Sequence, residues 1–159
     1  MVRKIGLASV KQQVYDYIAV KACKTMFLNK IGTYQCASIK GRGQTYGKKA
    51  IEKWIRKNPK KCKWVWKGDI EKFYPSVPHD KLKKLLKRDI KNSIVIYILF
   101  TLINTYIKGL CIGSYLSQFL ANYFLSYAYH YLSEKCFKIR HKRNGTIQRV
   151  RLLHYVLPP

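Results

Sequence analysis

Asp69 is the residue of this sequence whose type and position are best suited to chemistry. It lies in the stretch KWVWKGDIEKFYPSVPHD, residues 63–80, with large apolar side chains on both sides, in a chain that has 7 acidic residues against 32 Lys and Arg. A carboxylate among apolar side chains is costly unless a charged group meets it. That group could be Lys67 or Lys72 in a salt bridge, or Mg²⁺, which takes oxygen ligands and leaves room for phosphates. Composition alone favours the salt bridge.

The net charge of the chain is +25, and the basic residues are spread along it rather than gathered in a tail. The hydrophobic content of 48% is ample for a folded core. A folded body with this charge attracts polyanions, and nucleic acid is the polyanion that we expect as partner.

Neither the cysteines nor the apolar runs indicate a zinc site or a membrane protein. The 5 cysteines are irregularly spaced and form no CxxC or Cys/His cluster, and no signal peptide opens the chain, so a reducing cytoplasm is expected. The longest apolar run, residues 94–103, is too short to cross a bilayer, which takes about 20 residues. It predicts a buried helix, and no membrane partner is expected.

The first half of the chain reads as two helices and a strand. Residues 10–30 have a helical rhythm that places one set of side chains near one face: Val14, Tyr17, Ile18, Ala22 and Met26. Residues 40–49 are a glycine-punctuated basic loop that leads into a helix through Ala50 and Trp54, ended by Asn58-Pro59. Residues 62–70, rich in Trp and Val, predict a strand that ends near Asp69.

The second half reads as three helices and a hairpin. After a turn at Pro75 and Pro78, Asp80 is predicted to cap a helix whose apolar face follows i, i+3, i+4 spacing. A more buried helix covers about residues 93–107, and a long one covers about 114–134. Residues 138–159 predict a hairpin that turns at Asn144-Gly145. Helices, one strand and a hairpin in this order indicate an α+β fold.

Three segments resemble motifs of the reverse transcriptases of bacterial retroelements, including the group II intron-like, diversity-generating and prophage-borne kinds. Residues 69–80 resemble the first catalytic motif, in which a strand-end Asp is followed by an aromatic residue. Residues 109–134 resemble the next motif, commonly GLPIGxxxSQxxANxYL, and residues 38–57 resemble the fingers segment. The matching positions of the second motif are Gly109, Leu110, Ile112, Gly113, Ser117, Gln118, Ala121 and Asn122.

The resemblance implies an RNA-directed DNA polymerase built as a right hand. The chain would be a single partial domain of helices packed on a small antiparallel sheet, fingers-like over about 1–60 and palm-like over about 61–159, without the thumb. RNA template, DNA primer and dNTPs would be its ligands, Mg²⁺ its cofactor, and an accessory protein of the retroelement a further partner.

The resemblance also implies roles for single residues. Asp69 would bind two Mg²⁺ ions, with the carbonyl of Ile70 completing one coordination shell. Phe73 and Tyr74 would lie at the nucleotide, Tyr74 where the family keeps an aromatic residue that excludes a ribose 2′-hydroxyl. Both aromatic rings also suit a core.

Two further sets of residues complete the implied site. Gly113, Ser117 and Gln118 would lie beside the incoming nucleotide and the template base, and by themselves they also fit a glycine turn with a polar helix start. The phosphate-binding candidates of the fingers are Lys40, Arg42, Lys48 and Lys49.

The second catalytic motif of the family, Tyr-x-Asp-Asp, is missing. Residues 154–156 resemble its lead-in, but the sequence continues with Leu157-Pro158-Pro159 and contains no Asp-Asp pair. Glu71 is the acid nearest to Asp69, and the others lie far away in the sequence. We therefore expect a reading frame cut short and a fragment that is inactive by itself, with weak Mg²⁺ binding.

Two alternatives remain. One is a non-catalytic, basic nucleic-acid-binding protein derived from such a domain. The other, a basic ribosome-associated or DNA-binding protein, has no helix-turn-helix or zinc signature in its support. If the polymerase interpretation holds, Asp69 should lie at a strand end beside a basic cleft, with Gly113–Gln118 approaching it.

Overall fold

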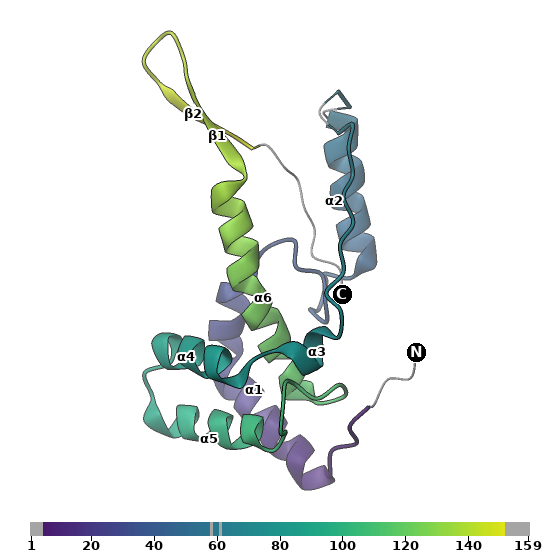
Figure 1. Ribbon diagram of the computed structural model, residues 1–159, viewed down its shortest axis with the longest axis vertical. Helices are drawn as coiled ribbons and strands as arrows, with labels where there is room; N and C mark the ends of the chain where they lie inside the picture. The colour runs from purple at the N-terminus through teal and green to yellow at the C-terminus, as the bar shows by residue number, and fades with distance from the viewer. Residues whose placement is uncertain (1–4, 58, 61, 152–159) are drawn as a thin grey trace. The chain divides into compact units, whose positions relative to one another are not determined.

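The computed structural model describes residues 5–57, 59–60 and 62–151 (Figure 1). These residues form a mostly helical α+β fold with one small antiparallel sheet, so the predicted fold class is confirmed at this coarse level. The helices are α1 Val10–Lys30, α2 Gln44–Lys57, α3 Phe73–Ser76, α4 His79–Asp89, α5 Ser93–Asn104 and α6 Tyr115–Lys135, and the strands are β1 Phe137–His141 and β2 Ile147–Arg151. None of these helices is long and apolar enough to span a membrane.

The chain divides into two compact units. The first contains Met1–Ile31 and Gly68–Phe124, and the second contains Gly32–Lys67 and Leu125–Pro159. Helices α1, α3, α4 and α5 therefore belong to the first unit, and α2 and the hairpin belong to the second. The division falls within α6, between Phe124 and Leu125.

The core of the first unit lies where α5 contacts both α1 and α4. Its side chains include Phe27 of α1 and Tyr123 of α6, whose rings meet edge to face at 5.5 Å. Leucines from α4 and α5 complete it, and Leu82, Leu86 and Leu99 have no exposed surface. Each such side chain contributes about 1.5–3 kcal/mol through burial.

Helix α1 has the predicted bounds but buries a different face. Ser9 caps it by accepting a hydrogen bond from the N–H of Gln12. Val14, Tyr17 and Ile18, predicted to lie on the apolar face, are 52%, 59% and 52% exposed. The buried residues are Asp16, Ala19, Val20, Cys23 and Phe27. Apolar residues occur on several sides of this helix, so periodicity alone does not select a face; close packing against α5 does.

Helix α4 confirms the predicted apolar face, since Leu82 and Leu86 are buried, but not the predicted cap. Pro78 occupies the N-cap position, and Asp80 lies in the first turn without a capping hydrogen bond. A carboxylate there still interacts favourably with the helix dipole.

Helix α5 is shorter and more exposed than predicted. It begins after Asn92, whose side chain accepts from two backbone N–H groups, and it ends at Asn104. Ile94 and Tyr97 are 68% and 73% exposed, because only one side of the helix packs in the core. The prediction of a buried helix was therefore wrong for half of its surface.

The predicted strand over residues 62–70 does not form. Trp64, Val65 and Trp66 are 93%, 87% and 89% exposed, and no ladder partner lies beside them in the described chain. A strand forms only where a neighbouring strand accepts and donates its hydrogen bonds. A high β propensity shows that the side chains would fit a pleated sheet surface, but it does not supply that neighbour. Helix α2 also begins at Gln44, inside the predicted basic loop.

The hairpin is confirmed over the residues that the structure describes. Strand β1 pairs with β2 in antiparallel register, from Phe137 opposite Arg151 to His141 opposite Ile147. The N–H of Gly145 donates to Lys142 at 3.0 Å, and Gly145 has a φ of 78°. Only the glycine of the Asn-Gly pair has positive φ, which indicates a longer loop with a bulge rather than a two-residue turn. The predicted lead-in at 154–156 lies outside the described residues.

Candidate functional site

Asp69 lies in an exposed segment ahead of α3, not at a strand end. Its Oδ1 accepts a hydrogen bond from the backbone N–H of the next residue, Ile70, at 3.0 Å. No salt bridge to Lys67 or Lys72 forms; Lys72 pairs instead with Glu71, at 3.5 Å, and both side chains are exposed. Such a pair contributes little to stability.

The residues around Asp69 do not by themselves fit a magnesium site. Across the residues that the structure describes, no group of three or more His, Cys, Asp or Glu side chains is gathered where it could hold a metal ion. An exposed carboxylate whose nearest acid, Glu71, is paired with a lysine offers Mg²⁺ one ligand.

The two motif segments meet through their backbones. The N–H of Leu110 donates to the carbonyl of Tyr74 at 2.8 Å, and a ring nitrogen of His79 bonds the carbonyl of Gly109. Gly109 has a φ of 69°, and a Cβ there would lie 2.5 Å from the carbonyl oxygens of Tyr74 and Pro75. The close approach of the two segments therefore requires glycine at this position.

Phe73 and Tyr74 are half-buried at this junction, with their rings edge to face at 5.9 Å. Burial raises the pKa of the Tyr74 hydroxyl above its usual value, so this group stays protonated at neutral pH. Ile70, whose carbonyl was a candidate metal ligand, is 54% exposed.

Gly113, Ser117 and Gln118 form a turn and the start of α6. The carbonyl of Gly6 lies against Gly113, where an added Cβ would be 2.7 Å from it. Ser117 is buried, and its N–H donates to the hydroxyl of Ser114 at 3.2 Å. Gln118 is partly exposed, and its carbonyl accepts from the side chain of Asn122 at 3.0 Å. These contacts give all three residues a structural role in the turn and the start of α6. Their contact with a nucleotide stays a prediction.

Asp16 is a carboxylate that the sequence interpretation set aside as distant. It is 2% exposed, and its two oxygens accept from the hydroxyl of Ser114 at 2.6 Å and from the side chain of Gln12 at 3.0 Å. Because Ser114 also accepts from Ser117, Asp16 fixes the turn before α6. Its spacing from Ala19 and Cys23 along α1 was the one signal that could have placed it on the buried face.

A hollow of about 360 Å³ lies beside Asp16, lined also by Gly113, Ser114 and the segment from Gly6 to Ala8. Next to this cluster, the pKa of Tyr106 is raised by burial first, then by a hydrogen bond with Cys111 and by the nearby Asp16 carboxylate. These groups join the N-terminal segment to the second motif within the first unit.

The four fingers candidates lie in the second unit. Arg42 donates to the carbonyl of Gly32 at 3.0 Å, so its guanidinium already supports the loop that precedes α2. Lys48 lies 3.9 Å from Glu52 in an exposed pair. Lys40 and Lys49 are exposed. Three of the four therefore present ammonium groups to solvent, where phosphate could reach them.

No known protein-family model matches this chain, and no curated protein is significantly similar to it.

Proposed function

We propose that this chain is the fingers and palm part of an RNA-directed DNA polymerase from a bacterial or phage retroelement. The observation that supports the proposal is the hydrogen bond from Leu110 to Tyr74. It joins the segment that follows Asp69 to the segment that begins with Gly109, and these are the two segments whose residues resemble the family's motifs.

The groups at this junction suit a nucleotide. Asp69 is solvent-exposed, so its carboxylate is open to a ligand, and Tyr74, further along the same segment, offers an aromatic ring whose hydroxyl stays protonated because burial raises its pKa. Polymerase chemistry takes carboxylates from two strands to hold a pair of metal ions. The 159-residue sequence contains no Asp-Asp pair, so we expect no polymerase activity from it alone.

A second candidate is a non-catalytic nucleic-acid-binding protein derived from such a domain. The net charge of +25 favours it, because phosphate contacts need only positive side chains. In that case Asp69 would have no catalytic role, and its replacement would leave function unchanged.

Primer extension on an RNA template separates the two candidates. The 159-residue chain should not extend a DNA primer with dNTPs and Mg²⁺. A chimaera that continues Val156 with a Tyr-x-Asp-Asp hairpin and a thumb from a bacterial retroelement enzyme should extend it. In that chimaera Asp69→Asn should abolish extension, and the control Glu134→Gln, at an exposed position of α6, should retain it. Extension that survives Asp69→Asn would refute the assigned role.

A further inference from the structure

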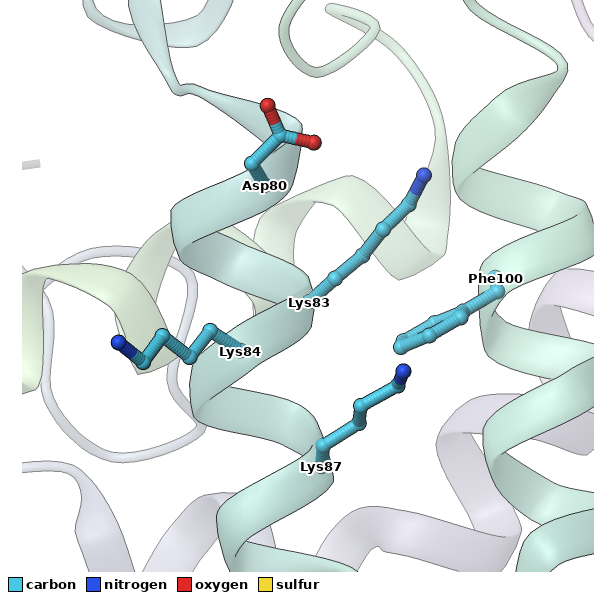
Figure 2. A pocket seen from close by; sticks show the side chains of 5 residues that line it. All are labelled: Asp80, Lys83, Lys84, Lys87 and Phe100. Atoms are coloured by element: carbon cyan, nitrogen blue, oxygen red, sulfur yellow. The ribbon is translucent and has the colours of Figure 1, made fainter.

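A second hollow in the first unit, of about 350 Å³, is lined by three lysines, one acid and one aromatic ring (Figure 2). Its lining residues are Asp80, Lys83, Lys84 and Lys87 of α4 and Phe100 of α5. It shares no residue with the junction of Tyr74 and Leu110. None of the roles considered above uses it.

The lysines are arranged around Phe100. The ammonium groups of Lys83 and Lys87 lie 5.6 Å and 5.5 Å from the centre of its ring. In Figure 2 the Lys87 side chain reaches toward the ring and the Lys83 side chain extends upward past it, whereas Lys84 extends to the other side of α4. Lys83 also donates to the side chain of Asn104 at 2.6 Å, which fixes its position.

This arrangement leaves positive charge uncompensated. Lys83 and Lys87 are four residues apart on one helix, where like charges repel and lower helix stability. Asp80 is the single acid of the lining, and within the described ranges no ion pair joins it to these lysines. An anion bound between the lysines would remove the repulsion.

We propose that this hollow binds a phosphate of single-stranded RNA, with Phe100 against the adjoining base or ribose. Lysine binds phosphate as a point charge, without the bidentate geometry that arginine imposes, so the lysines around Phe100 suit this ligand. An aromatic ring beside the lysines adds a stacking surface, which every base can use and which a free phosphate cannot. The inference rests on the proposed function in taking RNA as the partner, and it adds a contact outside the Asp69 segment.

The test measures the binding of the whole chain to a labelled, unstructured RNA of about 20 nucleotides as salt rises from about 50 to 200 mM. The variant Lys83→Gln/Lys84→Gln/Lys87→Gln is compared with Lys11→Gln/Lys21→Gln/Lys24→Gln, which removes the same charge from exposed positions of α1. We expect the α4 variant to bind about tenfold more weakly than the control variant. Its slope of log K against log salt should be shallower than that of the control by about 0.7, the value for one phosphate contact on a single strand.

A second variant isolates the aromatic contact. Phe100→Leu keeps an apolar side chain and all three lysines, and it should weaken RNA binding about fivefold while leaving binding of inorganic polyphosphate unchanged. Circular dichroism and thermal melting would show that each variant is folded.

The outcomes separate this inference from the proposed function. If the wild-type chain does not bind RNA, both fail. If it binds RNA and the α4 variant equals the α1 control, the hollow is not an RNA site and only this inference fails. The inference would also be overturned if the α4 variant lost affinity for anionic phospholipid vesicles but bound RNA as the α1 control does. It would be overturned too if Phe100→Leu lost as much affinity for polyphosphate as for RNA.

Discussion

The backbone N–H of Leu110 lies 2.8 Å from the carbonyl oxygen of Tyr74 and donates to it. This bond connects segments that are 36 residues apart in the sequence, and both lie in the first unit. It requires glycine at 109, because a side chain there would meet the carbonyls of Tyr74 and Pro75. The junction makes the stability of the fold and the geometry of the candidate site depend on the same few atoms.

Gly109→Ala should destabilise the protein strongly. Its φ of 69° already disfavours alanine, and the new Cβ would lie 2.5 Å from two backbone oxygens. Strain of this kind costs about 1–3 kcal/mol before the clash is added. The matched control is Gly145→Ala, where φ is 78° but the added Cβ would have no atom within 4 Å apart from those of its chain neighbours. Chemical denaturation of both variants should give the larger loss for Gly109→Ala; equal losses would contradict the close contact.

Asp16→Ala should cost about 1–3 kcal/mol of folding free energy, because it leaves Ser114 and Gln12 without their buried acceptor. Asp80→Ala is the control and should cost less, since that exposed carboxylate makes no capping hydrogen bond and loses only its interaction with the helix dipole. A double-mutant cycle of Asp16→Ala with Ser114→Ala should show coupling of about 0.5 kcal/mol or more. Additive effects would mean that the 2.6 Å hydrogen bond contributes little.

Tyr74 should make the protein lose stability in alkaline solution. Its folded pKa is raised above the ordinary value of 10.0, so its contribution is complete below pH 10.0 and is lost as pH rises toward the folded pKa. In that window the unfolded chain has already released the proton, so unfolding is favoured. Melting temperatures between about pH 9 and 11 should therefore fall less steeply for Tyr74→Phe than for wild type. Tyr131→Phe, at a residue that is 61% exposed, is the matched control substitution.

The affinity of the chain for RNA and DNA should depend steeply on salt and little on sequence. A net charge of +25 acts through phosphates, and each contact releases counterions from the nucleic acid. Titration of two RNAs of equal length and different sequence, at rising salt, measures both properties. A flat plot of log K against log salt would show that the charge does not serve binding.

The sequence correctly predicted the elements whose hydrogen bonds are local. The long helices α1 and α6 have nearly the expected bounds, and Asn144-Gly145 lies at the turn of the hairpin. A helix closes its bonds within four residues, and a short hairpin closes them across a turn, so a sequence window contains both partners. The resemblance to polymerase motifs predicted that Gly113–Gln118 approach Asp69. The bond between Tyr74 and Leu110 joins other residues of the same two segments, and the approach to Asp69 itself stays a prediction.

Tertiary structure decided the features that depend on distant partners. Trp64, Val65 and Trp66 have the composition of a strand, but no described neighbour pairs with them, so Asp69 does not end a strand. The face that α1 buries follows from packing against α5, not from its mixed apolar pattern. Asp16 fixes the turn before α6 because the hydroxyl of Ser114, 98 residues away in the sequence, donates a hydrogen bond to its carboxylate. Such contacts join residues that are far apart in the sequence, so a loop must close before they form. The free energy of these contacts comes from packing and desolvation in the folded chain, and a local sequence pattern therefore does not predict them.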